Sequence, residues 1–137
     1  MGEYLTKYHK TFEKDQFAKT SGIKLLEASP GYAKAEMVVQ ENHMNSVGVV
    51  HGGAMFTLAD FAFAVASNSH GKLALAINAE ISIFKSVKSG VLTAVAREIS
   101  LHNKLGTYLI EIQNENNEQV AHFKGTVYRK NEIMNFD

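Results

Sequence analysis

A single carboxylate stands inside the most apolar stretch of the chain. Residues 54–66 read AMFTLADFAFAVA, and only Thr57 and Asp60 interrupt the apolar run. A carboxylate is rarely buried without a partner, because removing its charge from water is costly. Burial would raise the pKa of Asp60 toward that of a useful general base. A structural carboxylate held by hydrogen bonds would give the same pattern, so the residues alone leave both interpretations open.

The tripeptide His51-Gly52-Gly53 precedes this stretch, at the start of a helix that we expect over residues 52–69. The first N–H groups of a helix have no acceptor within it and lie at the positive end of its dipole. Glycine also lets a ligand approach the backbone closely. Such a site could bind an anion or stabilise the oxyanion that develops on an attacked carbonyl. For a bare Gly-Gly pair, a tight turn into a helix is the simpler interpretation.

Gly52 and Asp60 are eight residues apart in the same predicted helix, which corresponds to about 12 Å of rise. One chain therefore cannot direct both groups at a single carbonyl carbon. Two copies of the helix, antiparallel across a twofold axis, could place each Gly52 opposite the partner's Asp60 and form two equivalent sites. If these residues act together, the protein is at least a dimer.

The two helices differ in character. The helix over residues 52–69 is apolar on every side, which predicts that it is buried. Residues 1–20 carry Leu5, Tyr8 and Phe12 at helical spacing among charged residues and predict an amphipathic helix at the surface.

The rest of the chain alternates with period two and predicts strands joined by short turns. Ser29-Pro30-Gly31-Tyr32 predicts a type II turn between the first two strands, and residues 130–137 predict a frayed tail. The expected fold is α+β, with a curved antiparallel sheet wrapped around the central helix. The expected strands cover residues 23–28, 33–39, 75–83, 91–101, a segment with Tyr108, Ile110 and Ile112, and 119–129.

Composition narrows the classes of function. The 137 residues fit one domain, and fourteen basic residues balance fourteen acidic ones, which argues against a nucleic-acid partner. The chain has no cysteine, so disulfides, thiolate-zinc sites and cysteine nucleophiles are excluded. The N-terminal segment lacks the apolar core of a signal peptide, and residues 54–66 are too few to span a bilayer. We expect a cytoplasmic protein that does not enter the membrane.

The histidines do not predict a metal site. The chain has no H-E-x-x-H motif, no G-x-S-x-G elbow, no P-loop and no dinucleotide-binding fingerprint. His43 could lie near His51, but two histidines without a carboxylate make a poor metal site. The other four are expected at the surface or in turns: His9, His70, His102 and His122.

The segment from Asn45 to Asp60 resembles the signature of hotdog-fold acyl-CoA thioesterases of the phenylacetic acid degradation (PaaI-like) type. That signature is an Asn, then a Gly, then His-Gly-Gly, then an Asp inside the helix, and the order and spacing here match without gaps. The similarity covers most of the chain, from about Phe17 to Arg129, although outside this segment it is mostly pattern. The resemblance implies the hotdog fold and thioester hydrolysis.

By this resemblance, Asp60 is the catalytic carboxylate, acting as general base or as nucleophile. Gly52 supplies the N–H that polarises the thioester carbonyl, Asn45 positions substrate or water, and His51 orients the cluster. The family draws the carboxylate from the opposite subunit to the other three groups, which agrees with the helix-length argument. Gly53 is a further candidate for substrate contact. The resemblance also implies a homodimer, paired into a tetramer, with no metal and no cofactor apart from the coenzyme A of the substrate.

Two departures from the family pattern concern substrate binding. Some relatives carry a serine or threonine on the strand after the helix, where this chain has Ala76 and Ile77. Asn78 or Ser82 could replace that hydroxyl, depending on which face of the strand each occupies. The next turn lacks the family's proline and has lysines instead. Those lysines, Lys85 and Lys88, could meet the phosphates of coenzyme A, or could be solvated surface charge.

The leading hypothesis is a thioesterase that hydrolyses a small or medium acyl-CoA or aryl-CoA to free acid and coenzyme A. A non-catalytic acyl-CoA-binding or regulatory protein is the alternative on the same fold. A hydratase or dehydratase of the superfamily fits less well, because such enzymes space their Asp and His differently. The acyl pocket could be lined by the aromatic residues of the helix, which could equally be core: Phe56, Phe61 and Phe63.

Overall fold

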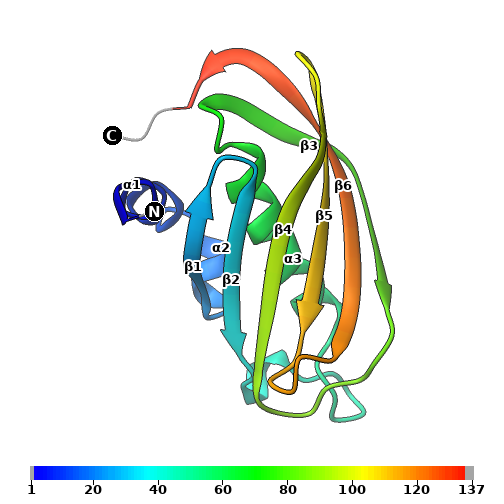
Figure 1. The fold of residues 1–137 in the computed structure, drawn as a ribbon. Coiled ribbons are helices and arrows are strands. Elements are labelled where there is room, and N and C mark those ends of the chain that lie inside the picture. Colours follow the sequence, from blue (N-terminus) through cyan, green and yellow to red (C-terminus); the bar gives the residue numbers. More distant parts are fainter. Residues whose placement is uncertain (1, 135–137) are drawn as a thin grey trace.

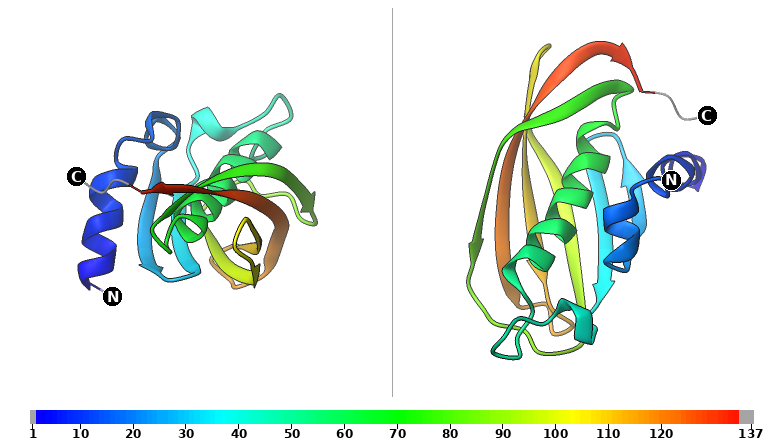
Figure 2. Two further views of the ribbon diagram at one scale, coloured as in Figure 1. Left: turned by 90° about the horizontal axis from the view of Figure 1, so that it is seen from above. Right: turned by 180° about the vertical axis from the view of Figure 1, so that it is seen from behind.

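Six antiparallel strands form one curved sheet, and the long helix α3 lies across its concave face (Figure 1, Figure 2). The computed structural model describes the backbone of residues 2–134 and the side chains of residues 6–134. The strand order is β1-β2-β4-β5-β6-β3, so β1 and β3 are the edge strands. The predicted α+β architecture is confirmed. The elements are α1 (Gly2–Phe12), α2 (Gln16–Thr20), β1 (Ile23–Ser29), β2 (Tyr32–Val38), the 3-10 turn η1 (Glu41–His43), α3 (Gly52–Ser67), β3 (Lys72–Ile83), β4 (Val91–Leu101), β5 (Leu105–Gln113) and β6 (Gln119–Ile133).

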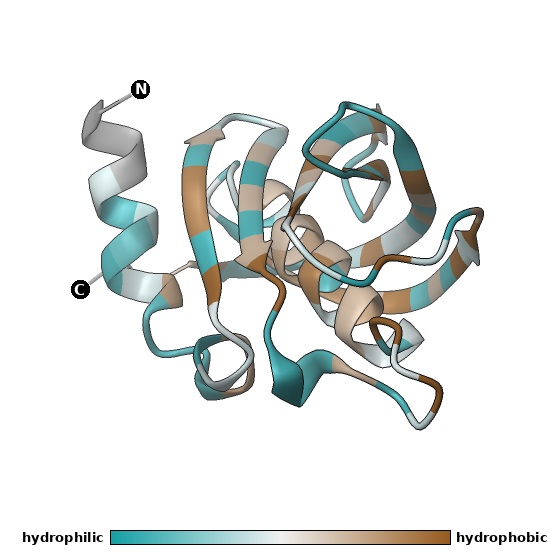
Figure 3. Cartoon of the chain, turned by 90° about the horizontal axis from the view of Figure 1, so that it is seen from below, coloured by the Kyte–Doolittle hydropathy of each residue, from teal (hydrophilic) through white to brown (hydrophobic). Residues whose placement is uncertain are grey.

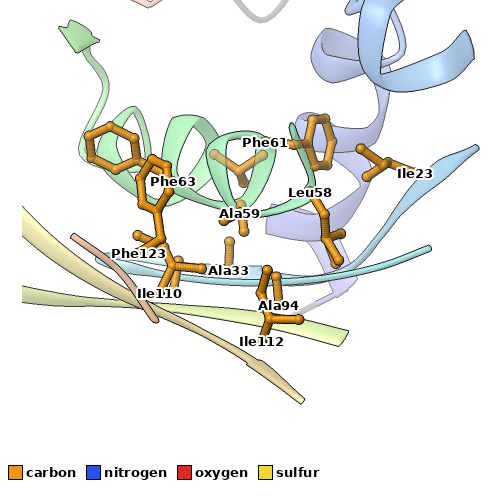
Figure 4. Close-up of a cluster of buried hydrophobic side chains, with 14 of the residues drawn as sticks. Ile23, Ala33, Leu58, Ala59, Phe61, Phe63, Ala94, Ile110, Ile112 and Phe123 are labelled. Carbon is orange, nitrogen blue, oxygen red and sulfur yellow. The ribbon is translucent and has the colours of Figure 1, made fainter. Parts of the chain in front are cut away.

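Small side chains let α3 approach the sheet closely. Ala59 of the helix, Ala33 of β2 and Ala94 of β4 are fully buried at this contact (Figure 4). Larger buried side chains such as Leu58 and Phe63 fill the space beside them, so that small and large residues interlock across the interface. Figure 3 shows the result as hydropathy that alternates along the strands beside a largely apolar helix. Across residues 2–134, no helix has both the length and the apolar character needed to cross a membrane.

Gly125 of β6 makes room for the ring of Phe63. A Cβ atom at position 125 would lie 2.6 Å from Cζ of that ring. The ring cannot easily move away, because it packs against Tyr108 and Phe123 at centroid distances of 5.9 Å and 5.6 Å. This contact sets how closely α3 approaches strands β5 and β6.

The predicted turn between β1 and β2 is present and is anchored to the end of α3. Gly31 has a φ angle of +72°, and since Pro30 cannot adopt a positive φ, the turn is type II. The Gly31 N–H donates to Oγ of Ser69 at 2.6 Å, and the Tyr8 hydroxyl donates to the Ser69 carbonyl at 2.8 Å. The residues that follow α3 therefore hold both the first hairpin and α1.

The prediction of one N-terminal helix over residues 1–20 is wrong. The chain forms two helices, because Asp15 has an extended backbone and caps α2 through a hydrogen bond from the Ala18 N–H at 3.0 Å. Tyr8 and Phe12 do face the core, as predicted. Met1 and the side chain of Leu5 fall outside the described part of the chain.

The prediction of a frayed tail from residue 130 is also wrong for its first part. Strand β6 continues to Ile133, which pairs with Lys72 of β3. The pairing explains the difference, since cross-strand hydrogen bonds order residues that sequence pattern alone leaves unassigned. Residues 135–137 lie outside the described residues.

We expect Gly125→Ala to lower the free energy of unfolding by about 1–3 kcal/mol, because the added methyl group overpacks against the ring of Phe63. Urea titration followed by circular dichroism measures this loss. Lys124→Ala, one residue away on the outer face, serves as the control and should change stability by less than about 0.5 kcal/mol. Equal losses in both variants would show that the contact does not limit packing.

Candidate active site

Asn45 organises the loop that leads into α3. Its Oδ1 accepts hydrogen bonds from the N–H groups of Val47 at 3.0 Å and Val49 at 3.2 Å, and its own N–H donates to the Val49 carbonyl at 2.8 Å. The side-chain NH2 group has no acceptor among the described residues. Asn45 therefore holds the loop through its oxygen and keeps two donors available for a ligand.

His51 is the N-cap of α3. Its Nδ1 accepts a hydrogen bond from the Gly53 N–H at 2.8 Å, so the ring proton is on Nε2. Its backbone N–H donates to the His43 carbonyl at 2.8 Å, which joins the helix start to η1. The ring therefore caps the first turn of α3, and the expected role of His51 in orienting the catalytic cluster stays a prediction.

The hydrogen bonds of this first turn single out Gly52. Ala54 and Met55 donate their N–H groups to the His51 carbonyl at 2.9 Å and 3.3 Å, and Gly53 donates to the His51 ring. The Gly52 N–H has no acceptor within the part of the chain that the structure describes. Gly52 is therefore the free donor at the positive end of the helix dipole, whereas the N–H of Gly53 is already used.

Asp60 lies two turns further along α3 and is half-buried. Its carboxylate accepts no hydrogen bond from any described residue. Burial raises the pKa of Asp60, and the negative charge of Asp15 at the start of α2 raises it further. A desolvated carboxylate without hydrogen-bond donors is suited to accept a proton or to attack a carbonyl.

The structure brings some of the predicted residues together and separates others. Asn45, His51 and Gly52 surround the start of α3, while Asp60 is about 12 Å along the same helix axis. A Cβ added at Gly52 would lie 3.3 Å from Cδ1 of Ile83, at the end of the edge strand β3. The donor end of the site therefore lies next to an open sheet edge.

A cavity of about 380 Å³ opens beside the start of α3. It is bounded by His51, Gly53 and Thr57 on one side and by Phe17, Thr20 and Ser21 of the α2 region on the other. Phe17 is 71% exposed. We call this space the catalytic cavity, because His51 and Gly53 at the start of α3 border it; Gly52 and Asp60 do not line it.

The register of β3 decides the orientation of the two candidate polar residues. Asn78 pairs with Thr126 and Ser82 with His122, on the face opposite the one that carries Phe123 and contacts α3. In this chain both side chains therefore point away from α3. Their role in substrate binding stays a prediction.

The two candidate lysines have different surroundings. Lys85 forms an exposed ion pair with Glu118 at 2.9 Å, and the hydrogen bond from Lys85 is the main reason that the pKa of Glu118 is lowered. Lys88 is exposed and has no ion-pair partner among the described residues. Of the two, Lys88 carries the charge that an added phosphate would meet without competition.

Two of the three helix phenylalanines belong to the core. Phe61 and Phe63 are 5% and 1% exposed, and Phe56 packs against Phe123 at a centroid distance of 5.0 Å. Sequence reasoning left open whether they form a pocket, and none of the three lines the catalytic cavity.

Sequence reasoning missed two residues that shape the site. Asp15 acts on the pKa of Asp60, and its signal was that of a helix cap before QFAKT. His43 is buried, accepts from the Gln40 N–H at 2.9 Å and donates through Nε2 to the Ser21 carbonyl at 2.7 Å, which ties η1 to the end of α2. No local pattern marks that contact. Within the described residues, no group of three or more His, Cys, Asp or Glu could hold a metal ion.

The curved antiparallel sheet around α3 is the hotdog fold of the PaaI structures. The chain belongs to the thioesterase superfamily, whose family model matches residues 47–121.

Three comparisons support this assignment. A predicted esterase of Archaeoglobus fulgidus is 50% identical over 122 residues, which cover 88% of this chain and 79% of that protein. The acyl-coenzyme A thioesterase PaaI of Escherichia coli K12 is 37% identical over 122 residues, which cover 88% of this chain and 87% of that protein. The solved structure of the E. coli PaaI protein from the phenylacetic acid degradation operon superposes with a TM-score of 0.92 at 32% identity, covering 98% of each chain. The expected family and fold are confirmed, and the roles of individual residues stay predictions.

We expect His51→Ala to remove the N-cap of α3 and to lower the free energy of unfolding by about 1 kcal/mol. His51→Asn should retain most of that stability, because its side-chain oxygen can accept the Gly53 N–H. Thermal unfolding of the two variants beside the wild type measures the difference. Identical melting temperatures for the Ala and Asn variants would contradict the capping role.

We expect Asp15→Asn to move the acid limb of the pH–rate profile of thioester hydrolysis to lower pH. With Asp60 as the predicted catalytic carboxylate, activity would need its ionised form and would be lost as pH falls through its pKa. Removing the Asp15 charge lowers that pKa. Asparagine can still cap α2. Glu13→Gln, which removes a neighbouring charge that does not act on Asp60, should leave the acid limb unchanged.

Proposed function

We propose that this protein hydrolyses the thioester of a small or medium acyl-CoA or aryl-CoA, releasing the free acid and coenzyme A in the cytoplasm. The observation that carries the proposal is the presence on α3 of two polar groups without partners among the described residues: the Gly52 N–H, which has no acceptor, and the half-buried Asp60 carboxylate, which has no hydrogen-bond donor. The relative from E. coli named acyl-coenzyme A thioesterase supports the choice of substrate. No metal and no further cofactor is required by this chemistry.

In the proposed reaction the thioester carbonyl oxygen accepts a hydrogen bond from the Gly52 N–H. Asp60 of a second copy then acts at the carbonyl carbon in one of two ways. It takes a proton from water, whose oxygen attacks the carbon, or it attacks directly and forms an anhydride that water cleaves. In either case the C–S bond breaks, the thiolate leaves and is protonated, and one water is consumed. The free amide NH2 of Asn45 positions the water or the carbonyl.

The assembly that completes the site is proposed as a homodimer formed through β3. The other edge strand, β1, has α1 and α2 packed along it, whereas the outer edge of β3 has no partner among the described residues. Its apolar side chains are exposed, Leu75 at 52% and Ile77 at 60%. An uncovered, apolar edge strand is a site for pairing with another chain. Antiparallel pairing of two β3 strands would set two copies of α3 antiparallel, as the shared site requires.

Two such dimers are proposed to form a tetramer through the outer face of the sheet. That face carries a cross-strand group of exposed apolar residues formed by Leu75, Tyr128 and Leu105, which are aligned in register. Within residues 2–134, no helix covers this face (Figure 2).

Coenzyme A binding is proposed to involve Lys88. Lys85 is proposed to take part by leaving its ion pair with Glu118 and binding a phosphate of coenzyme A in its place. Asn78 and Ser82 remain candidates for contact with the part of the substrate that lies outside the helix-facing side of β3.

A non-catalytic acyl-CoA-binding protein is the second candidate function. The observation that favours it is the helix-facing side of β3, where Ala76, Ala79 and Ile81 supply no hydroxyl to hold an attacking water. Saturable acyl-CoA binding without release of free thiol would establish this alternative.

We expect Asp60→Asn to reduce kcat by about 10²–10⁴-fold, because asparagine can neither accept the proton nor attack as a carboxylate. A free-thiol release assay over a panel of acyl-CoAs measures the loss. The variant should remain folded, since replacing a desolvated carboxylate by an amide removes an unfavourable charge. Unchanged turnover would exclude the proposed role of Asp60.

We expect Gly52→Pro to reduce kcat by about 10²–10³-fold, because proline has no N–H to donate. Proline is favoured at the first position of a helix, and the extended backbone of His51, with ψ of 136°, accommodates a following proline. Gly52→Ala adds the same Cβ but keeps the N–H, so it is the matched control.

Mixing the two inactive variants tests the shared site directly. When Asp60→Asn and Gly52→Pro chains are unfolded and refolded together in equal amounts, about a quarter of the sites combine an intact Gly52 with an intact Asp60. Recovery of about that fraction of wild-type activity would show that the site uses two copies. No recovery in a mixture shown to form heterodimers would overturn the proposal that Gly52 of one copy acts with Asp60 of another.

A further inference from the structure

A second cavity, of about 540 Å³, lies on the other side of α2 from the catalytic cavity. Ala18 and Lys19 of α2 border this space, whereas Phe17 and Thr20 border the catalytic cavity. The floor of the second cavity is apolar and is formed by α1, β1 and α3. We call it the lateral trough, and its floor consists of Phe12, Ile23, Leu25 and Phe61.

The side chains that form the floor of the lateral trough are well packed. Ile23, Leu25 and Phe61 are each less than a tenth exposed, and the rings of Phe12 and Phe61 meet edge to face at a centroid distance of 6.0 Å. This aromatic contact joins α1 to α3. An apolar ligand would therefore find a preformed surface.

The rim of the trough is charged. Lys19 and Lys24 are exposed and have no ion-pair partner among the described side chains. Glu13 and His9 complete the rim. Two lysines against one glutamate leave a positive excess above an apolar floor, which is the complement of a molecule with an apolar body and one negative charge.

We propose that the lateral trough binds an apolar monocarboxylate, at a site separate from the catalytic cavity. The carboxylate lies between Lys19 and Lys24, and the apolar body lies on Phe12 and Phe61. The choice of ligand class rests on the proposed function, because hydrolysis of an acyl-CoA releases an acid of this kind. The binding site itself rests on the shape, floor and charge of the trough.

The position of α2 allows a ligand in the trough to influence the active site. This helix has only five residues, and its two sides border the two cavities. Its cap, Asp15, acts on Asp60, and His43 ties its end to η1. A ligand that contacts Ala18 and Lys19 therefore acts on the same element that shapes the catalytic cavity. The released acid is in this way expected to alter the rate of hydrolysis.

A peptide strand added to β1 is the other occupant that a sheet edge suggests. The helices α1 and α2 lie beside that edge (Figure 1), and the lysines without ion-pair partners favour an anion over a neutral backbone.

Titration of octanoate into the full-length protein by isothermal calorimetry tests the proposal. We expect saturable binding that becomes about tenfold weaker in the double variant Lys19→Gln/Lys24→Gln. Leu26 of β1 also lines the trough. Binding should be lost in Leu26→Trp, because the larger side chain fills the trough. The matched control is Lys34→Gln/Lys124→Gln, which removes two lysines that border neither cavity.

The outcomes separate the possibilities. Absence of octanoate binding, or binding that neither trough variant weakens, overturns the proposal. A change in the mass of the assembly in Leu26→Trp would show that the trough is a contact between copies, and would also overturn it. Octanoate that alters the hydrolysis rate of the wild type but not of Leu26→Trp supports the coupling through α2. Calorimetry does not depend on turnover, so failure of the proposed thioesterase activity would be recognised separately.

Discussion

The rigid rise of α3 determines how the candidate site is divided. A hydrogen-bonded helix cannot fold back on itself, so the donor at its start and the carboxylate two turns later keep a fixed separation of about 12 Å. The helix is in turn held at a fixed depth by the alanines beneath it and by the ring of Phe63 against Gly125. Neither residue can be brought to the other by a local movement. In the proposed reaction, the two groups can therefore act together only when a second copy of α3 is placed beside the first.

The polar groups of α3 differ in whether they have hydrogen-bond partners. At the helix start, nearly every donor is matched: His51 accepts for three residues, and Asn45 holds the loop in front. Among the described residues, the Gly52 N–H is left without an acceptor and the Asp60 carboxylate without a donor. Unmatched polar groups cost stability in a folded chain. Leaving one donor and one acceptor unmatched on the same helix is consistent with a ligand or a second copy that satisfies both.

Much of this arrangement could be predicted from sequence. The apolar run around Asp60, the His-Gly-Gly start and the alternating strands each follow local rules of periodicity and capping. The N-terminal break was missed because the cap signal of Asp15 lies within a run of charged residues that also fits a continuous surface helix; the hydrogen bond that Asp15 accepts from the Ala18 N–H shows that it begins a new helix. The extent of β6 was missed because residues 130–133 are ordered by pairing with β3. The facing of Asn78 could not be read from alternation either, since an irregularity between Ala76 and Asn78 shifts the register.

The two edges of the sheet are not equivalent, and this limits growth of the assembly. A sheet with two open edges can add copies at both sides and extend without end, as fibres do. Here α1 and α2 lie along β1 and leave β3 open. When two such sheets join at β3 across a twofold axis, each uses its one open edge on the other, and the combined sheet presents only covered strands. In the proposed dimer, the N-terminal helices beside β1 would therefore prevent further strand addition after the first pairing through β3.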